Sequence, residues 1–199
     1  MRFRGPMLAA ASILAVTLSS PRALPDVGLE PGVSARDPKP AGDYIGGVSQ
    51  AVLQASPPEL DALFADVAGY PRLLPDTLDA RLVQREPDGF LAWVRQGNSL
   101  FHASYTVRVR ASIGPNGERV LRFQLDPSRP HGIRDATGYV RYQALAPLAD
   151  GKPRVLLTCG TWVDIGPGIV RALFGGTIQR VILSVPQKVR GYVEQHPRA

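Results

Sequence analysis

The side chains best suited to acid–base, nucleophilic or metal chemistry are few, because the chain of 199 residues has three histidines and one cysteine. His102, His131 and His196 lack the short spacing that metal-binding motifs use. Cys159 lies in an apolar stretch, where a thiol is more often an inert core side chain than a nucleophile. The sequence also has no glycine-rich phosphate loop and no Gly-x-Ser-x-Gly elbow. We therefore predict no catalytic residue, no metal and no cofactor, and an enzyme is the less favoured hypothesis.

An N-terminal leader is indicated by Arg2 and Arg4, by the apolar run at residues 7–18 and by the small residues that follow. The run is too short to cross a bilayer, which needs about 20 apolar residues, and it is typical of a secretory signal. We predict a cleaved signal peptide at residues 1–23 and a periplasmic or secreted protein. Residues 24–43 are rich in Pro, Gly and Asp without apolar periodicity, which predicts a disordered linker. The folded domain should span residues 44–195.

The remainder of the chain predicts an α+β domain. Residues 45–55 are a candidate first strand, and Ser56 with Glu59 three residues later marks the start of a helix that should end at Gly69. A short turn or one-turn helix follows at residues 70–75. Alternation of period two and turn-like breaks then predict six strands, at residues 79–85, 90–95, 101–111, 118–125, 138–145 and 155–163. Their short connections predict an antiparallel meander.

Alternation gives the predicted sheet an apolar face and a wet face. Phe101, Tyr105 and Val107 share the apolar face, where the Tyr105 hydroxyl needs a partner from protein, water or ligand. Trp93 is ambiguous: it is either an inward side chain or, because it shares its parity with Arg95, a cover of the outer face. The outer face also carries four arginines, Arg108, Arg110, Arg122 and Arg141. This basic strip is either an ordinary solvated surface or a contact for an anionic membrane.

A long apolar stripe predicts a C-terminal helix. Its members follow one another at steps of three and four residues: Ile169, Val170, Leu173, Phe174, Ile178, Val181, Ile182, Val185, Val189 and Val193. This spacing places the stripe on one side of the helix, which should pack against the apolar face of the sheet. Pro186 should kink the helix, because it cannot donate a hydrogen bond to the carbonyl of Ile182.

The order of a strand, short helices, a six-stranded meander and a long C-terminal helix resembles the START-like or SRPBCC superfamily, in particular its polyketide cyclase/dehydrase and coenzyme Q-binding branch. The resemblance covers residues 45–195. Five short motifs carry it: Pro57-Pro58-Glu59-Leu60, Phe64-Ala65-Asp66-Val67, Tyr70-Pro71 with Leu74-Pro75, Gly138-Tyr139-Val140-Arg141-Tyr142 and Pro167-Gly168-Ile169-Val170.

The resemblance implies a helix-grip fold, in which a curved antiparallel sheet of about seven strands wraps around a long C-terminal helix, with two short helices between strands 1 and 2. Family members hold lipids, quinones, sterols or polyketides in an apolar cavity between sheet and helix. We expect this chain to bind or carry a hydrophobic small molecule of that kind. The expected lining consists of nine residues: Phe101, Tyr105, Val107, Leu121, Phe123, Leu125, Phe174, Ile178 and Ile182. Arg134 and Asp135, at the expected mouth, either orient a polar head group or form a solvated pair.

Two alternatives to a carrier stay open at this point. The first is a polyketide cyclase/aromatase-like enzyme that uses the same cavity, although the predicted leader argues against it because polyketide synthesis is cytoplasmic. The second is an interaction module whose cavity is filled by side chains. For an exported protein we expect no nucleic-acid partner, whereas an anionic membrane surface is a candidate partner.

Overall fold

The structure is a computed structural model that describes residues 42–98 and 101–196. These residues belong to a compact unit that spans Asp37–Ala199. The predicted signal peptide at residues 1–23 and nearly all of the predicted linker at residues 24–43 lie outside the described residues.

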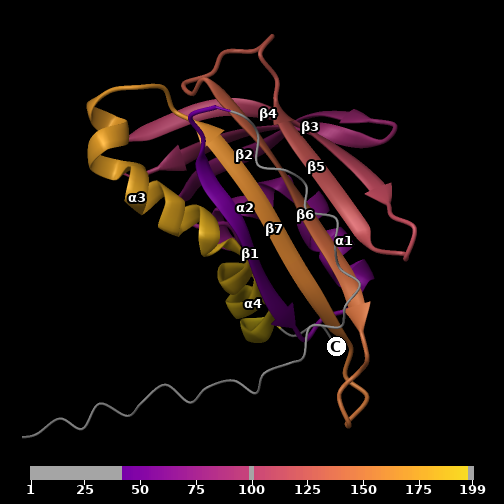
Figure 1. Cartoon of the computed structure of the whole chain (residues 1–199). Helices are drawn as coiled ribbons and strands as arrows, with labels where there is room; N and C mark the ends of the chain where they lie inside the picture. Colours follow the sequence, from indigo (N-terminus) through magenta and orange to yellow (C-terminus); the bar gives the residue numbers. More distant parts are fainter. Residues whose placement is uncertain (1–41, 99–100, 197–199) are drawn as a thin grey trace, which may run out of the picture. The chain divides into compact units, whose positions relative to one another are not determined.

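A single antiparallel sheet of seven strands forms the body of this unit, in the order β1-β7-β6-β5-β4-β3-β2 (Figure 1). The meander predicted from the sequence is confirmed, with β1 added to its open edge beside β7. The strands are β1 (Ile45–Leu53), β2 (Thr77–Glu86), β3 (Gly89–Gly97), β4 (His102–Ile113), β5 (Arg119–Leu125), β6 (Asp135–Leu145) and β7 (Arg154–Asp164).

Three short helical segments connect β1 to β2: α1 (Pro57–Ala65), the 3₁₀ turn η1 (Val67–Gly69) and α2 (Tyr70–Leu73). The predicted helix start is confirmed, because the Ser56 backbone N–H donates to Glu59 Oε2 at 2.5 Å and the Ser56 hydroxyl donates to the same oxygen at 2.7 Å. Helix α1 ends at Ala65, earlier than predicted, and the turn η1 continues the segment to Gly69.

The predicted C-terminal helix is interrupted at the position where the sequence predicted a kink. It forms two helices, α3 (Ile169–Leu183) and α4 (Val185–Gln195). Ser184 lies between them, and its hydroxyl donates to the carbonyl of Val181 at 2.8 Å. Pro186 follows in the first turn of α4, where its missing N–H is not needed. None of the helices in the described residues is long and apolar enough to cross a membrane.

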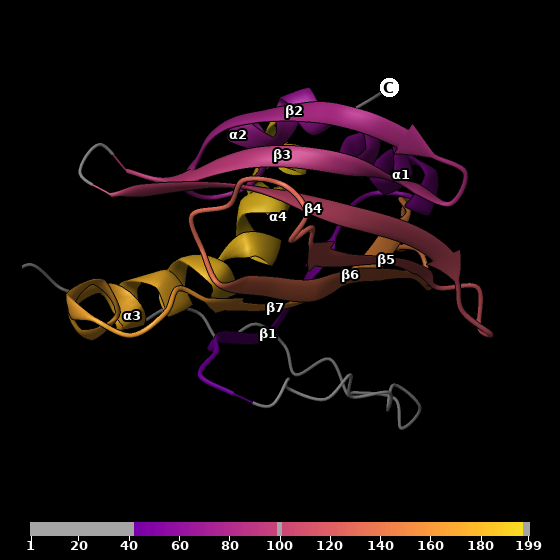
Figure 2. The same cartoon turned by 90° about the horizontal axis from the view of Figure 1, so that it is seen from above.

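The register of the strands separates the two faces of the sheet. Ala51 pairs with Leu157, Leu157 pairs with Tyr142, and Leu125 pairs with Val107, so these side chains share one face, which we call the inner face. Figure 2 shows the sheet curling from β2 to β1 around this face, with α4, α1 and α2 on the same side. The helix-grip α+β architecture predicted from the sequence is therefore confirmed.

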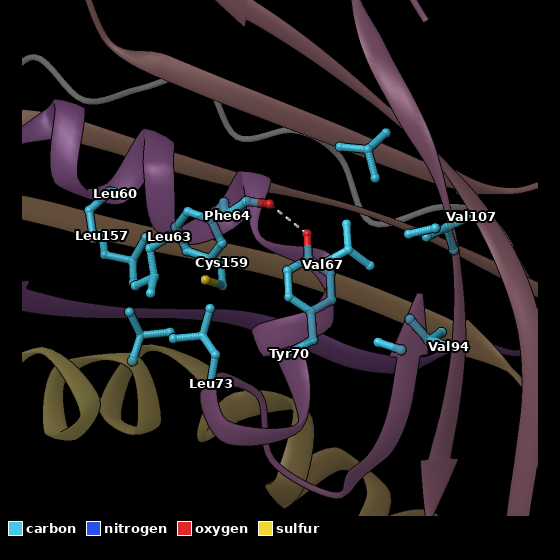
Figure 3. Packing of buried hydrophobic residues seen from close by; sticks show 14 of the residues in the cluster. Leu60, Leu63, Phe64, Val67, Tyr70, Leu73, Val94, Val107, Leu157 and Cys159 are labelled. Carbon is cyan, nitrogen blue, oxygen red and sulfur yellow. Dashed lines mark hydrogen bonds between the residues drawn. The ribbon is translucent and has the colours of Figure 1, made fainter. Parts of the chain in front are cut away.

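A closely packed core fills the space between the inner face and the helices α1, α2 and α4 (Figure 3). Phe64 of α1 stacks on Tyr142 of β6, with ring centroids 5.9 Å apart. The Tyr70 hydroxyl donates to the carbonyl of Phe64 at 2.8 Å, which ties α2 to α1. Val189 anchors α4 in the same cluster and is fully buried. The position of α4 is thus fixed by core packing.

Candidate functional site

Small side chains form one patch of the inner face on β1, β7 and β6. Register places six of them together, and we call this group the floor: Gly47, Ser49, Ala136, Gly138, Cys159 and Thr161. Helix α3 runs along the first half of β1, where Gln179 Nε2 donates to the carbonyl of Gly46 at 3.4 Å. Small side chains on a sheet leave room between the sheet and a covering helix. The floor is therefore a part of the inner face where the sheet itself contributes little side-chain volume.

The apolar residues of α3 that face the sheet are only partly buried. Phe174, Ile178 and Ile182 are all half-buried, and none of the side chains described in α3 reaches full burial. In α4, by contrast, Val189 is 0% exposed. Helix α3 is thus packed more loosely on the sheet than α4, and part of its apolar side stays accessible. We call the floor together with the half-buried apolar side of α3 the α3 site.

Two large side chains lean over the floor. The ring of Phe123, from β5, lies 2.4 Å from the position that a Cβ on Gly138 would occupy. Leu183, at the end of α3, lies 3.2 Å from the corresponding position on Gly47. The two glycines accept these side chains because they have no Cβ. Phe123 and Leu183 therefore fill the places that a Cβ on Gly138 and a Cβ on Gly47 would take.

The nine residues predicted to line a cavity occupy different environments. Tyr105, Val107 and Leu125 lie in the buried core, and Leu121 and Phe123 are partly buried against it. Phe174, Ile178 and Ile182 belong to α3. Phe101 precedes β4 and is 45% exposed, with its ring centroid 4.8 Å from that of Phe174. Phe101, Phe123 and the three α3 residues border the α3 site, and all nine stay predicted ligand contacts.

The buried hydroxyl of Tyr105 has a protein partner. It donates to Oε1 of Gln96, and Gln96 Nε2 donates in turn to Thr77 Oγ1 at 3.2 Å. Burial raises the pKa of Tyr105 well above its ordinary value, so the phenol is neutral at physiological pH. The strand predicted from the sequence ended at residue 95, which left Gln96 in the break that follows it. Its alternation with Ala92 and Val94 on β3 is the signal that puts it on the inner face.

Three residues of the floor carry a polar side-chain atom, namely Ser49, Cys159 and Thr161. Burial raises the pKa of the Cys159 thiol to about 12, so this side chain is an uncharged, weakly polar group. Ser49 pairs with Cys159 across β1 and β7. Its hydroxyl oxygen is buried and has no hydrogen-bond partner within the described part of the chain. A buried hydroxyl without a partner costs free energy, and a polar atom of a bound molecule would lower that cost.

The histidines and the predicted mouth residues are separate from the α3 site floor. His102 is exposed on the outer face of β4, and the ring nitrogens of His131 and His196 lie 2.7 Å and 2.9 Å from main-chain carbonyls. Asp135 accepts hydrogen bonds from the Tyr44 hydroxyl and from the Ala136 N–H. In residues 42–98 and 101–196, no three His, Cys, Asp or Glu side chains gather as a metal site would require.

The outer face of the sheet carries a shallow groove of about 650 Å³, lined by Arg108, Arg110, Arg122, Gln124, Asp126, Thr137, Tyr139, Trp162 and neighbouring residues. Arg108 lies 3.1 Å from Glu86 and 3.6 Å from Asp126, and Arg110 forms an ion pair with Asp88. Carboxylates therefore compensate much of the positive charge of this face.

A second outer pocket of about 310 Å³ lies beside Trp93. The guanidinium of Arg81 is 4.5 Å from the centre of the Trp93 ring, and of the two placements left open for Trp93 the structure has the one on the outer face. The two outer pockets are open and carry charged side chains. Neither is the apolar cavity expected from the sequence, which would lie on the inner face.

Comparison with known proteins identifies the fold. The sequence matches no protein-family model and no curated protein. Among solved structures, a fragment of a STAR-related lipid transfer protein from Xanthomonas axonopodis has a TM-score of 0.61 at 16% identity, covering 73% of this chain and 84% of that one. A protein from Thermus thermophilus has a TM-score of 0.54 at 17% identity, with 75% and 94% covered.

A third solved structure is the Zhui aromatase/cyclase from a Streptomyces species, with a TM-score of 0.52 at 16% identity, covering 76% of this chain and 94% of that one. At this level of identity the likeness shows the fold alone. The chain has the START-like, helix-grip fold. Its placement in the cyclase and coenzyme Q-binding branch stays a prediction.

Proposed function

We propose that this protein binds and carries a hydrophobic small molecule, such as a lipid, quinone, sterol or polyketide-like compound, at the α3 site. The observation that carries the proposal is the incomplete burial of the apolar side of α3 above a floor of small residues. A lipid transfer protein is among the structures of the same fold, which agrees with this class of ligand.

Burial of apolar surface would supply the binding free energy. Phe123 and Leu183 over the floor, together with Phe174, Ile178 and Ile182 of α3, offer an almost wholly apolar surface. A lipid tail that buries about 300 Å² would gain about 7 kcal/mol before the costs of association, which corresponds to micromolar binding at best. The Ser49 hydroxyl would favour ligands with a hydrogen-bonding group near the floor.

We propose binding without chemical transformation. General acid–base catalysis needs a group whose pKa lies near the working pH, and the Cys159 thiol and the Tyr105 phenol are both held neutral by burial. The hydroxyl of Tyr105 is also directed to Gln96. The cyclase-like alternative would need a reacting group at the α3 site other than these two.

We further propose that the protein acts in the periplasm or outside the cell. Arg2, Arg4 and the apolar run at residues 7–18 support this proposal. The intact mass of the protein from a periplasmic extract tests it, and a start between residues 20 and 26 is expected. Full-length chain in the membrane fraction would contradict it.

The ligand experiment uses the mature protein purified from its own host, followed by native mass spectrometry and by incubation with a panel of fatty acids, quinones and sterols. We expect a ligand to be retained and returned unchanged. Ile178→Glu places a charge under α3 and should abolish binding, whereas Val48→Glu, on the outer face at a side chain 47% exposed, should not.

Three results would change this conclusion. Turnover of a ligand that disappears in Tyr105→Phe would support the cyclase-like enzyme. Absence of any bound ligand in the host-purified protein and in the panel would support the interaction module with a filled cavity. Equal loss of binding in Ile178→Glu and Val48→Glu would place the ligand away from the α3 site.

A further inference from the structure

A second candidate site lies on the outer face of the sheet, at the groove of about 650 Å³, which we call the outer groove. Its volume is within the range of small-molecule sites. In Figure 2, the helices α1, α2 and α4 lie on the inner side of the sheet, so they do not cover the outer groove. The register of β4 to β7 arranges its side chains in two rows across the sheet, of which one contains Arg110, Arg122 and Tyr139 and the other contains Arg108, Gln124, Thr137 and Trp162.

Two aromatic rings form the base of the outer groove. Tyr139 and Trp162 converge over Gly160, since a Cβ on that glycine would lie 2.4 Å from the Tyr139 ring and 3.0 Å from the Trp162 ring. The ring centroids are 6.1 Å apart, and both side chains are 4% exposed. Because the rings are buried, the groups left to contact a ligand are the more exposed polar side chains around them.

Hydrogen-bond donors surround this base. Arg110, Arg122 and Gln124 are exposed, and the side chain of Arg108 is 40% exposed. Arg110 lies directly opposite Arg122 on the neighbouring strand, an arrangement of like charges that costs free energy. A ligand oxygen that accepts hydrogen bonds from both guanidiniums would lower that cost. The row is therefore suited to a ligand rich in oxygen atoms.

Carboxylates accompany the arginines of the outer groove. Arg108 lies 3.1 Å from Glu86 and 3.6 Å from Asp126, which lines the groove itself. Arg110 forms an ion pair with Asp88. These pairs hold the guanidiniums in place, and a carboxylate has lone pairs for further hydrogen bonds. The groove thus offers donors and acceptors side by side.

This balance of charge distinguishes between classes of ligand. Nucleic acids and anionic bilayers bind to uncompensated cations, and the carboxylates of the outer groove would repel their phosphates. The hydroxyl groups of a saccharide carry no charge, and each of them both donates and accepts hydrogen bonds. Arginines, carboxylates and the amide of Gln124 together match such hydroxyl groups. The groove is also open and shallow, which suits a chain that continues beyond it.

We propose that the outer groove binds a saccharide chain, which accepts hydrogen bonds from the arginines and Gln124 and donates hydrogen bonds to Asp126. The proposal goes beyond the carrier function and does not depend on it, because the outer groove and the α3 site lie on opposite faces of the sheet. Binding at the outer groove would attach the protein to a polysaccharide while the inner face holds a hydrophobic ligand.

An array of neutral and carboxylated oligosaccharides, probed with the mature protein, tests this proposal. Titration calorimetry then measures the affinity for the oligosaccharide that binds best. A single-stranded DNA oligomer and vesicles of phosphatidylcholine mixed with phosphatidylglycerol serve as phosphate-bearing probes. We expect a saccharide to bind, and we expect both phosphate-bearing probes to bind more weakly.

Two substitutions in the outer groove locate the binding. Gln124→Ala should lower the affinity for the saccharide about twofold to tenfold, the equivalent of one hydrogen bond, and Arg110→Ala should lower it about tenfold or more, because a charged donor is lost. The matched controls Gln54→Ala and Arg85→Ala remove exposed side chains of the same types outside the groove, so they should bind like the wild type. Because all four side chains are exposed, melting temperatures should stay near that of the wild type.

Each outcome decides for or against the outer groove. Saccharide binding that falls in Arg110→Ala and Gln124→Ala, and stays in both controls, supports the proposal. Three results would overturn it: no binding to any oligosaccharide of the array, equal loss of binding in the groove variants and the controls, or DNA or vesicles binding more strongly than every saccharide. Ile178→Glu should bind the saccharide like the wild type, which separates this site from the carrier function on the inner face.

Discussion

Two substitutions on the C-terminal helices test whether α4 anchors the fold while α3 borders a site. Val189→Ala removes two carbons from a side chain of α4 that is 0% exposed. Ile182→Ala removes three carbons from a half-buried side chain of α3. If both helices packed equally on the sheet, Ile182→Ala would be the more destabilising change, because it deletes more apolar volume.

The expected order is the reverse. Val189→Ala loses two buried carbons at about 0.8 kcal/mol each and leaves a cavity, so it should cost about 2–3 kcal/mol of unfolding free energy. Ile182→Ala should cost less than about 1.5 kcal/mol, because part of the side chain is already accessible. For a domain of this size, a loss of about 1 kcal/mol lowers the melting temperature by roughly 2–4 °C.

Urea unfolding followed by tryptophan fluorescence measures both stabilities, and titration with a fluorescent fatty acid measures binding. We expect Val189→Ala to lower stability and to leave the affinity of the folded protein nearly unchanged. Ile182→Ala should instead weaken binding with a small effect on stability. A cost for Ile182→Ala equal to or above that of Val189→Ala would show that α3 packs as closely as α4, and the α3 site would be refuted.

Three further predictions concern particular side chains. Burial raises the pKa of Cys159 to about 12, so Ellman's reagent should react with this thiol at pH 8 only after unfolding. The contribution of the buried thiol to the free energy of unfolding should be full below about pH 9. It should decline as the pH rises toward 12, because the thiol of the unfolded chain ionises first. Gly138→Ala should lower the free energy of unfolding by about 1–3 kcal/mol or more, because the new Cβ would lie 2.3 Å from the main-chain oxygen of Gly160. Gly176→Ala should raise it by about 0.5–1 kcal/mol, because nothing lies within 4 Å of the new Cβ and alanine favours the helix. Thermal unfolding measures both changes. Tyr142→Phe removes the hydrogen bond to Asp61 and should cost about 1 kcal/mol in urea, and an unchanged midpoint would show that this bond adds nothing.

Much of the fold could be predicted because its signals are local. Alternating side chains mark each strand, and the turn residues between strands limit the meander to short connections. Ser56 and Glu59 mark a helix start that depends on only four consecutive residues. Parity along β3 linked Trp93 to Arg95 but left its face open, and the contact with Arg81 decides it. Such patterns depend on the covalent geometry of the chain, so they can be read without knowledge of distant contacts.

The site was predicted less completely, because it depends on contacts between distant segments. The floor brings together Gly47, Gly138 and Cys159 from three strands, and only the register reveals that they are neighbours. The steps of three and four in α3 could not show which part of a wide stripe the sheet covers, so Ile169 and Leu173, which are 74% and 66% exposed, were assigned inward. Gln96 was missed as the partner of Tyr105 because hydrogen bonding between two strands leaves no mark in the spacing of either residue.

The pairing of β1 with β7 makes the first strand depend on the last. Gln50 and Thr158, whose side chains form a hydrogen bond across this pair, are 108 residues apart in the chain. During synthesis β1 therefore has no partner until nearly the whole domain has been made, and α3 and α4 must follow before the inner face is covered. Proteins with contacts of such long sequence separation fold slowly, on the scale of milliseconds to seconds. An unpaired apolar strand is prone to aggregate over that time, so a truncation that removes β7 should leave β1 as the segment that nucleates insoluble material.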